Sequence, residues 1–363
     1  MHPMAEQIAI YSHSFLPNPG GLERNTDILA CALQRLGYQV TVVTRAKIKH
    51  TSMPVFPYTV VRQPRFAAYM KLLRQSMLVI VNGGISIPGL LGAMIARKPA
   101  MVIHQMAARV ISMGNLCKMA KSLLRYPLCY YPSLHIGVSG ACLEFDGIRE
   151  QKTKMVVYNP VHEYYAQHAK KNVQRTKKYD LLYAGRLVKE KGLEVLLSAL
   201  KQLSFDQRKI EICICGCGRD EEWFEKQCRE LKHLNPTFKG YLEIAELANV
   251  YAETSVLVLP SQDHPEGCPL VIGEAMTYGI PVIVSDQKAN IETAGRAGIE
   301  FKSGDGKALG TAIINLLRDK TMYDICSRAA IERAKAFSME SYENNIRDAV
   351  NICIENVPNH KSH

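Results

Sequence analysis

The sequence predicts an α/β protein with two doubly wound parallel sheets, one in each of two domains. Short apolar runs rich in β-branched residues alternate with amphipathic stretches along the whole chain, a pattern typical of parallel strands joined by helices. The series begins again at Tyr179, after the polar and basic segment 168–178. A chain of 363 residues has room for two domains of ordinary size. We therefore expect two Rossmann-like domains that face a central cleft.

The domain boundaries follow from these patterns. Residues 1–168 are expected to form the first domain, 169–178 a linker and 179–338 the second domain. A last helix over about 339–356 could cap either domain, including the first.

The first half opens with a βαβ unit. QIAIYS (7–12) is the first predicted strand, and the loop HSFLPNPGGLER leads into an amphipathic helix that ends near Leu36, before Gly37. YQVTVVT (38–44) is the second strand. Further strands are predicted at 58–62, 77–82, 100–104, 134–138 and 154–158.

The second half repeats the alternation. Its predicted strands are YDLLYAG (179–185), KIEICICG (209–216), a short strand near Phe238, VLVL (256–259) and IPVIV (280–284). Helices are predicted at 191–203, 219–232, 243–252, 269–278, 304–319 and 321–336, with Pro269 in a first turn and Gly279 as a C-terminal stop.

Composition is that of a soluble cytoplasmic protein. The chain has 47% hydrophobic and 22% charged residues and no apolar run long enough to span a bilayer. Its first residues, MHPMAEQIAIYS, lack the basic flank, apolar run and cleavage site of a signal peptide, so we expect a cytoplasmic location. The eleven cysteines are expected to be reduced thiols. Cys213, Cys215 and Cys217 have neither a zinc-site nor a redox spacing, so we expect no metal there.

Charge is divided unevenly between the halves. Residues 1–178 hold 23 Lys and Arg against 7 Asp and Glu, a net of +16, and the remainder has a net of −5. A basic half indicates a polyanionic partner such as an anionic membrane, a phosphorylated lipid or nucleic acid, or else a basic surface with no partner. The segment 109–132 mixes Met, Leu and Tyr with cations, as in an interfacial helix or a core helix with a basic face.

Several strand ends carry residues suited to phosphate and sugar chemistry. Gly20 and Gly21 follow the first strand, where glycine lets backbone amides approach a phosphate, although the full G-x-G-x-x-G pattern of nicotinamide enzymes is missing. Arg186 and Lys191 follow the strand that ends at Gly185 and could clamp a diphosphate. Taken alone, each of these features also fits an ordinary turn or a solvated basic loop.

Two carboxylates lie near the predicted helix at 269–278. Glu266 precedes it and Glu274 lies inside it, so both could face one crevice at the end of the strand at 256–259. Spacing alone is equally consistent with two unrelated surface acids. Gly216 closes another strand, with room for a nucleoside, and His104 ends the strand AMVIH.

In combination, these motifs resemble the retaining glycosyltransferases of family four, which have the two-domain GT-B fold. PNPGGLER resembles the N-terminal glycine loop, VIH the strand ending in an active-site His, GRLVKEKG the G-R-x(4)-K-G phosphate motif and EGCPLVIGE the E-x(7)-E motif. ICGCG resembles the G-x-G that follows the next strand. The segment VVYNP departs from the family pattern, because Pro160 replaces a Gly.

The resemblance implies a role for each matching residue. Arg186 and Lys191 would neutralise the donor diphosphate, Glu266 would bind the hydroxyls of the donor sugar, Glu274 would bind the ribose, and His104 would lie near the reacting sugar. The catalytic set would be His104, Arg186, Lys191 and Glu266. The donor-binding set would add Gly21, Gly185, Gly216, Gly267, Cys268, Pro269, Leu270, Val271 and Glu274. Many relatives carry Gly where this chain has Pro269.

The resemblance also implies the reaction and its partners. A hexosyl group would pass with retention from a nucleotide sugar to a glycan or a polyprenyl-diphosphate-linked acceptor in polysaccharide or lipopolysaccharide synthesis, with no cofactor and no metal. The E-G-x-P variant at 266–269 favours a UDP-sugar over GDP-mannose. The basic first domain would receive the acceptor at the anionic inner face of the cytoplasmic membrane, as a peripheral protein.

Two other functions are considered. A nucleotide-sugar epimerase could use the same fold, but additional acid and base groups cannot be identified. A basic nucleic-acid-binding protein would need a stacking motif or a recognition helix, and the sequence has neither. Nucleic acid is therefore not an expected partner.

Overall fold

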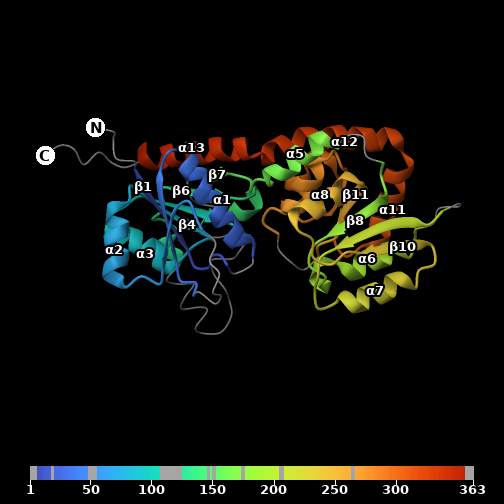
Figure 1. Ribbon diagram of the computed structural model, residues 1–363, viewed down its shortest axis with the longest axis horizontal. Coiled ribbons are helices and arrows are strands. Elements are labelled where there is room, and N and C mark those ends of the chain that lie inside the picture. Colours follow the sequence, from blue (N-terminus) through green and yellow to red (C-terminus); the bar gives the residue numbers. More distant parts are fainter. Residues whose placement is uncertain are drawn as a thin grey trace. The chain divides into compact units, whose positions relative to one another are not determined.

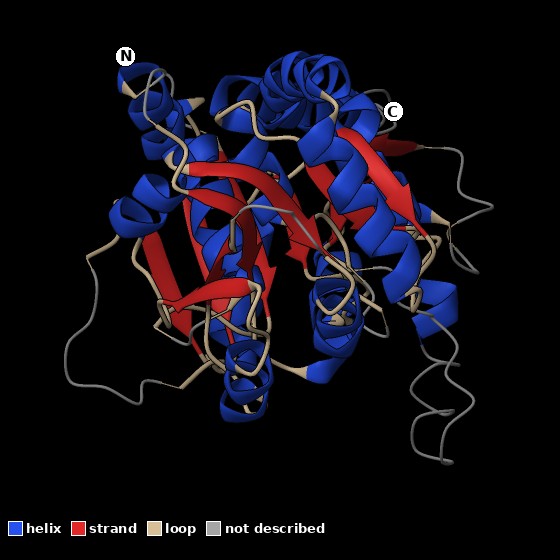
Figure 2. Cartoon of the chain, turned by 90° about the vertical axis from the view of Figure 1, so that its right-hand side faces the viewer, coloured by secondary structure: helices blue, strands red, loops and turns tan. Residues whose placement is uncertain are grey.

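The computed structural model describes residues 6–17, 20–47, 55–106, 125–144, 148, 153–172, 176–203, 208–262 and 266–355. The chain forms two compact units, one of residues 1–159 with 342–363 and one of residues 160–341. Each unit contains one parallel sheet flanked by helices (Figure 1). Figure 2 shows the strands of each sheet between helices.

The sheet of the first unit has seven strands, all paired in parallel. Its strands are β1 (Gln7–Ser12), β2 (Gln39–Thr44), β3 (Thr59–Arg62), β4 (Leu78–Asn82), β5 (Ala100–His104), β6 (Leu134–Gly137) and β7 (Lys154–Val156). Their order is β3-β2-β1-β4-β5-β6-β7, so the direction of winding reverses between β1 and β4. Near-continuous apolar runs form these strands because both faces of the sheet are covered.

The described helices of the first unit are α1 (Gly21–Arg35), α2 (Phe66–Gln75), α3 (Ile87–Ala96), the 3₁₀ turn η1 (Gly140–Leu143) and most of α13 (Met339–Glu355). One core cluster packs α2 and α3 on the sheet, with Leu73, Leu90 and Val81 fully buried. Gly89 fits there because a Cβ atom would lie 3.0 Å from both Tyr11 and Val81.

The sheet of the second unit has six parallel strands. They are β8 (Tyr179–Ala184), β9 (Ile210–Cys215), β10 (Leu234–Phe238), β11 (Thr254–Leu259), β12 (Val282–Ser285) and β13 (Gly298–Phe301). Their order is β10-β9-β8-β11-β12-β13, so the winding reverses between β8 and β11. This is the strand order of a dinucleotide-binding sheet.

Helices and 3₁₀ turns alternate with these strands. They are α5 (Glu163–Lys171), η2 (Lys189–Lys191), α6 (Leu193–Leu200), α7 (Glu221–Arg229), α8 (Ile244–Ala252), α9 (Leu270–Thr277), α10 (Lys288–Ala294), η3 (Gly295–Ala297), α11 (Gly306–Arg318), α12 (Lys320–Ala334) and η4 (Lys335–Phe337). The main core joins α6 and α11 to one face of the sheet through Leu196, Ile313 and Ile214.

The predicted fold class of two doubly wound parallel sheets is confirmed, and each named strand is present within a few residues of its predicted bounds. The sequence interpretation gave no bounds for α2, α3, α5 and α10, and it missed β13. The helix predicted to begin at Pro269 begins at Leu270, because Pro269 takes an extended conformation (φ −66°, ψ 105°) as the N-cap.

The boundary between the units differs from the predicted one. The second unit begins at Pro160 and includes α5, because α5 packs on α8 and α9. The Tyr165 and Tyr251 ring centroids lie 5.7 Å apart in that packing. The expected linker therefore starts inside a helix, and its residues 173–175 lie outside the described residues, as do residues 109–124 of the expected interfacial segment.

Candidate functional site

Two loops of the second unit meet where the strand order of its sheet reverses. One follows β8 and contains Arg186 and Lys191, and the other follows β11 and contains Glu266. Ligands of open α/β sheets bind at this position, because the loops on either side of the reversal diverge and leave a crevice at the carboxyl ends of the strands. Three residues expected from the sequence to act together thus lie in the loops that follow the two strands at the reversal.

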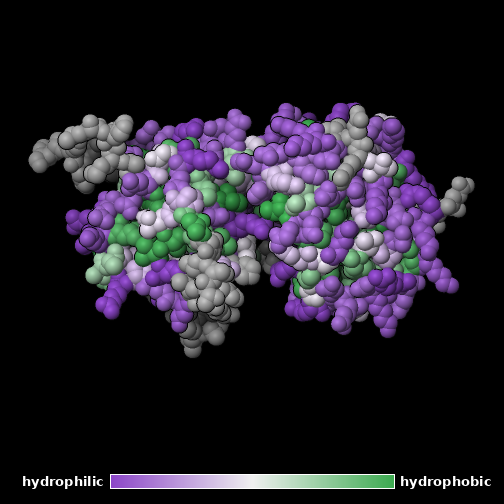
Figure 3. Space-filling view, in the orientation of Figure 1, coloured by the Kyte–Doolittle hydropathy of each residue, from purple (hydrophilic) through white to green (hydrophobic). Residues whose placement is uncertain are grey.

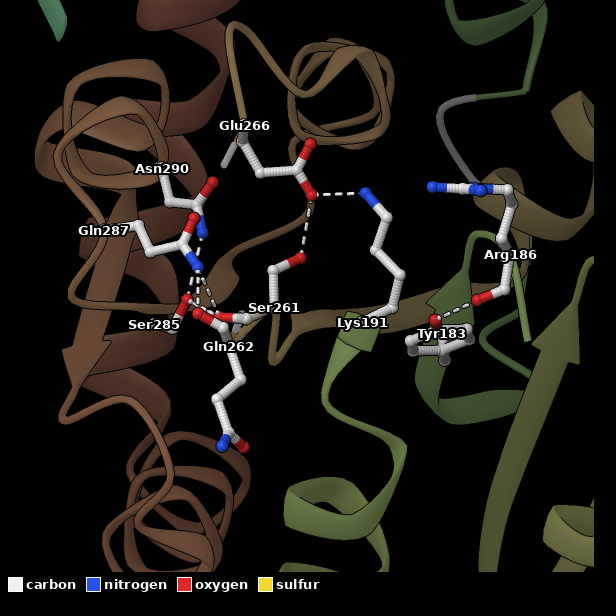
Figure 4. A network of polar contacts seen from close by, with 9 residues as sticks. All are labelled: Tyr183, Arg186, Lys191, Ser261, Gln262, Glu266, Ser285, Gln287 and Asn290. Carbon is white, nitrogen blue, oxygen red and sulfur yellow. Dashed lines mark hydrogen bonds and ion pairs between the residues drawn. The ribbon is translucent and has the colours of Figure 1, made fainter. Parts of the chain in front are cut away.

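Lys191 and Glu266 form an ion pair between these loops. The Lys191 Nζ lies 2.5 Å from Glu266 Oε1, and the two side chains are 14% and 12% exposed. Figure 4 shows the ammonium and the carboxylate pointing toward each other, with Arg186 on the side of Lys191 away from Glu266. The site therefore contains two cations and one carboxylate.

Tyr183 in β8 anchors the backbone of Arg186. The Tyr183 hydroxyl donates a hydrogen bond of 2.8 Å to the Arg186 carbonyl oxygen. Burial of the phenol and the negative charge of Glu266 both raise the pKa of Tyr183. The phenol therefore remains a neutral donor, and it holds the start of the Arg186 loop against the sheet.

Ser261 is a member of the site that the sequence interpretation did not identify. Its hydroxyl donates a hydrogen bond of 2.9 Å to Glu266 Oε1, the same oxygen that Lys191 contacts. Its carbonyl oxygen accepts hydrogen bonds from Ser285 Oγ at 2.6 Å and Gln287 Nε2 at 3.0 Å. Asn290 Nδ2 in turn donates to Ser285 Oγ at 3.0 Å.

This network fixes the loop that carries Glu266 to the turn between β12 and α10 (Figure 4). Ser261, Ser285 and Asn290 are fully buried. The sequence contained a usable signal, because the polar run SDQKAN (285–290) directly follows a buried strand. Polar residues at a strand's carboxyl end are candidates for a site in this fold.

Close backbone packing explains two glycines of the site. A Cβ atom at Gly192, whose φ is +81°, would lie 1.8 Å from the Pro260 carbonyl oxygen, so this glycine lets the two loops touch. A Cβ atom at Gly216, with φ +126°, would lie 1.9 Å from the Gly185 carbonyl oxygen. Gly185 and Gly216, both predicted to bind donor, thus join the ends of β8 and β9.

The remaining predicted donor-binding residues lie around the start of α9. Gly267 and Cys268 precede the N-cap Pro269, while Leu270 and Val271 form the first turn, whose N-terminus carries no side-chain cap. Glu274 lies inside the helix, and its Oε2 accepts a hydrogen bond of 2.7 Å from the buried Tyr251 hydroxyl. That bond orients the Glu274 carboxylate, whose predicted contact with ribose stays a prediction.

The first unit holds the other two predicted residues, His104 and Gly21. His104 ends β5 and is 2% exposed, and its Nε2 lies 3.0 Å from Nδ1 of the buried His135. Burial and the neighbouring His135 lower the pKa of His104 to about 3, so its imidazole is neutral at physiological pH. Gly21 begins α1, and a Cβ atom there would meet nothing within 4 Å.

A chain of neutral side chains joins the strand ends around His104. Gln105 Nε2 donates to Asn82 Oδ1, and its Oε1 accepts from Asn25 and Asn159, each at 3.0 Å. Asn82 donates to Thr26 Oγ1 at 3.0 Å. These bonds link β4, β5, α1 and the end of the first unit without a single ionic group.

The two sites therefore differ in the chemistry that they offer. The second unit offers cations and a carboxylate, which suit a diphosphate and a hydroxyl-bearing group. The first offers neutral donors and acceptors, which suit hydroxyls. Within the described part of the chain, no three His, Cys, Asp or Glu side chains are placed to share a metal ion.

Residues 165–333 match the family model described as glycosyl transferases group 1. A glycogen synthase of Mycobacterium tuberculosis is 32% identical over 162 residues, which are 44% of this chain and 39% of that protein. The matched part thus spans less than half of this relative. The resemblance predicted from the motifs is confirmed over this range.

Solved structures extend the likeness over nearly the whole chain. The Anabaena protein Alr3699/HepE in complex with UDP and glucose has a TM-score of 0.70 at 18% identity, covering 95% of this chain and 99% of that chain. The lipopolysaccharide outer core galactosyltransferase WaaB has a TM-score of 0.65 at 19% identity, with 95% and 99% covered. At this level of identity the likeness shows the fold, which is the GT-B class predicted from the sequence.

Proposed function

We propose, from the match of residues 165–333 to glycosyl transferases group 1, that this chain is a retaining hexosyltransferase. It transfers a sugar from a nucleotide-sugar donor to a glycan or lipid-linked acceptor in polysaccharide or lipopolysaccharide synthesis. The second unit holds the donor and the first unit the acceptor. The reaction uses no cofactor and no metal ion.

The main support for this proposal is the contact of Lys191 with Glu266, beside Arg186, at the point where the strand order reverses. Two cations and one carboxylate at the mouth of a dinucleotide-type sheet fit a sugar diphosphate better than any single-charge ligand. The resemblance of GRLVKEKG and EGCPLVIGE to the family motifs supports a diphosphate on Arg186 and Lys191 and a sugar on Glu266.

Catalysis on this proposal is electrostatic. Lys191 is paired with Glu266, and on this proposal its ammonium also contacts the diphosphate of the bound donor. Negative charge grows on the leaving nucleotide as the glycosidic bond breaks, and Arg186 and Lys191 stabilise that charge from fixed positions. Glu266 is then available to accept hydrogen bonds from sugar hydroxyls, while Ser261 keeps its carboxylate oriented.

The nucleotide is proposed to be UDP rather than GDP. The E-G-x-P sequence at 266–269 supports this choice, and the Anabaena neighbour of the same fold was solved with UDP. A thermal-shift screen of UDP, GDP and their sugars tests it, because a ligand that binds only the native state raises the melting temperature. Stabilisation by GDP compounds alone would replace UDP in the proposal.

The reaction is tested with the purified chain, UDP-hexoses and membrane-lipid or glycan acceptors. Release of UDP that depends on acceptor, with an unchanged anomeric configuration in the NMR spectrum of the product, supports retaining transfer. Turnover of the donor alone would indicate an epimerase. Arg186→Ala is expected to abolish transfer, and Arg208→Ala is the matched control, since Arg208 pairs with Asp180 at the opposite end of the sheet.

The proposed lipid-linked acceptor and the anionic membrane rest on the first unit. That unit holds 20 Lys and Arg against 9 Asp and Glu, a net of +11, whereas the second unit holds 25 of each. Phe66, Leu91, Met94 and Ile95 of α2 and α3 are exposed, Phe66 to 69%. Figure 3 shows apolar surface over these helices, bordered by hydrophilic residues.

An exposed apolar patch with cations around it is suited to an anionic lipid surface. None of the described helices is long and apolar enough to cross a bilayer. We expect the chain to co-sediment with liposomes containing anionic lipid and to lose that binding in a Phe66→Ser/Ile95→Ser variant. Ile325→Ser, an exposed apolar position in the second unit, is the control. Binding that is independent of anionic lipid would contradict this part of the proposal.

A further inference from the structure

A cavity of about 530 Å³ lies in the first unit at the carboxyl ends of β1 and β2, beside α2 and α3. Its volume falls in the range of about 300–1,000 Å³ that is typical of small-molecule sites. Most of its lining is apolar and comprises Tyr11, Val43, Phe66, Tyr69, Leu91 and Ile95. The two tyrosines and the valine are buried, and the other three side chains are exposed. The cavity therefore has a buried floor and an apolar rim.

Three polar residues, Thr44, Arg45 and Gln63, line the cavity where β2 and β3 end. Gln63 has a φ of +46°, a left-handed conformation that residues with side chains rarely adopt. Two hydrogen bonds hold it there, because its backbone amide donates to the Thr44 carbonyl at 2.8 Å and its Nε2 donates to the Arg45 carbonyl at 3.0 Å. Strained residues of this kind are concentrated at ligand-binding positions.

Arg45 brings a positive charge to this polar end. Within the part of the chain that the structure describes, its guanidinium takes part in no ion pair or hydrogen bond. Residues 28–143, which include every lining residue except Tyr11, contain 14 Lys and Arg and no Asp or Glu. No carboxylate lines the cavity, so nothing in its lining would repel an anion. An apolar interior with a cationic end suits a molecule that has one anionic head and one hydrocarbon chain.

The polar end lies at the edge of the sheet where the neutral network of the first unit also lies. Arg45 follows β2, and the bond between Gln105 and Asn82 lies at the ends of β4 and β5. The strand order β2-β1-β4-β5 separates these positions by three strand spacings, or about 14 Å. A head group on Arg45 is therefore on the same edge as the groups that suit hydroxyls.

We propose that this cavity binds the hydrocarbon chain of a single-chain lipid phosphate whose head group pairs with Arg45, and that this amphiphile is the acceptor of the transferase. The guanidinium holds the phosphate by charge-assisted hydrogen bonds, and the chain covers the apolar lining. The acceptor class is thus a prenyl or alkyl phosphate or diphosphate rather than a free glycan. This inference rests on the proposed function for the role of the amphiphile as acceptor, but not for its binding.

Calorimetry with the purified full chain and farnesyl phosphate, kept below its micelle concentration, tests the binding. We expect saturable binding at one site. Farnesol, which lacks the charged head, is expected to bind about ten-fold to a hundred-fold more weakly, and inorganic phosphate, which lacks the chain, is expected to bind more weakly than farnesyl phosphate. Absence of saturable binding by farnesyl phosphate would overturn the proposal. Equal affinity for farnesol or for inorganic phosphate would contradict a site with two parts.

Variants test each part of the cavity. Leu91→Trp fills the cavity but keeps its rim apolar, and displacing only two methylene groups of the chain weakens binding about ten-fold. Gln75→Trp is its control, at an exposed position of α2 outside the lining. Ile95→Trp fills the cavity from the next turn of α3 and serves if Leu91→Trp does not fold, which circular dichroism checks. Equal affinities of the filling variants and Gln75→Trp would overturn the assignment of the chain.

The head group is tested in the same way. Arg45→Gln removes the cation, and we expect the affinity for farnesyl phosphate to fall about ten-fold to a hundred-fold while that for farnesol stays the same. Arg74→Gln is the matched control, since Arg74 is exposed at the other end of α2 and outside the lining. A loss in Arg74→Gln as large as in Arg45→Gln would show that general surface charge, and not Arg45, attracts the phosphate.

Kinetics separate this inference from the proposed function. Farnesyl phosphate is expected to raise the KM for a polyprenyl-linked acceptor and to leave kcat unchanged, because both molecules occupy the cavity. Binding without this competition would contradict the role as acceptor. A chain that binds farnesyl phosphate but transfers no hexose would end the proposed function and leave the lipid phosphate site standing. Hexose transfer to free glycans by a chain that does not bind farnesyl phosphate would end this inference and leave the glycosyltransferase intact.

Discussion

The candidate sites of the two units differ in charge: one contains ionic side chains and the other contains neutral ones. In the second unit, Lys191 and Glu266 form an ion pair, and Arg186 lies beside this pair. The neutral Ser261 hydroxyl donates a hydrogen bond to the Glu266 carboxylate. In the first unit, His104 is a neutral ring bonded to a second neutral ring, and the surrounding network through Gln105 contains only amides and hydroxyls.

This difference is informative because the unit with the neutral site has the larger net charge. The first unit has a net charge of +11 and the second has none. The excess positive charge of the first unit therefore lies outside the neutral network around His104 and Gln105 and is suited to recruiting a polyanion. The second unit has no net charge, yet its site contains two cations and one carboxylate. A charged site stabilises charge that develops in a reaction, and a neutral site recognises hydroxyls by hydrogen bonds.

Removing the cation of the charged site should have the largest effect. On the proposed function, Lys191→Ala removes a positive charge from beside the leaving diphosphate. Losing one such group costs about 3–4 kcal/mol of transition-state stabilisation, or about a hundred-fold to a thousand-fold in kcat. Steady-state kinetics with donor and acceptor measure it. Lys191→Arg keeps the charge and is expected to lose less, although its fork cannot reproduce the point contact of an ammonium.

Lys189→Ala is the matched control for that variant. Lys189 lies two residues away, is exposed, and pairs with Glu194 rather than Glu266. Melting followed by the fluorescence of Trp223, the single tryptophan of the chain, checks that the second unit stays folded. Wild-type turnover in Lys191→Ala would remove the diphosphate contact from the proposal.

Low pH should instead destabilise the first unit around the neutral site. The pKa of His135 in the folded chain is about 4, below the value of about 6.5 in an unfolded chain, because burial disfavours the charged ring. Its contribution to stability is complete above pH 6.5 and is lost as pH falls toward 4, since the unfolded state binds the proton first. The loss amounts to about 3 kcal/mol for this residue.

Hydrogen exchange can locate that loss. Between pH 6.5 and 4, amides of β5 and β6 should lose protection in the first unit, while Trp223 fluorescence shows the second unit still folded. The change should be smaller in His135→Leu, which has one buried imidazole fewer. Equal loss of protection in the two units would show that the neutral site has no special sensitivity to acid.

The sequence was sufficient for the alternation of elements, because buried parallel strands are near-continuous apolar runs. It missed β13, whose four residues GIEF contain too short an apolar run, and the short α10. It identified Lys191 and Glu266 as partners in one site through a motif. It could not identify Ser261 or His135, because their contacts depend on which strands are neighbours and on the path of each loop.

Removing the hydrogen bond from Ser261 to Glu266 should have an intermediate effect. Ser261→Ala deletes one of the two contacts on Glu266 Oε1 and leaves Lys191 in place. A hydrogen bond to a charged group contributes about 1.5–3 kcal/mol, so we expect kcat/KM to fall by about ten-fold or more, with the nucleotide affinity itself little changed. Calorimetry with UDP separates the two. Loss of UDP binding would mean that Ser261 supports the whole loop rather than Glu266.

The smallest effect is expected within the neutral network, at Asn159. Its Nδ2 donates to Gln105 Oε1 at 3.0 Å, but Asn25 donates to the same oxygen at the same distance. Asn159→Ala therefore leaves Gln105 with a partner and should cost only about 0.5–1.5 kcal/mol, the net value of one neutral hydrogen bond. Gln105→Leu removes the shared acceptor from both amides and should cost more than Asn159→Ala and Asn25→Ala taken singly. Urea unfolding, followed by hydrogen exchange in β4 and β5, measures the stability of all three variants. A loss of stability in Asn159→Ala as large as that in Gln105→Leu would show that Asn25 and Asn159 do not share Gln105 as the geometry indicates.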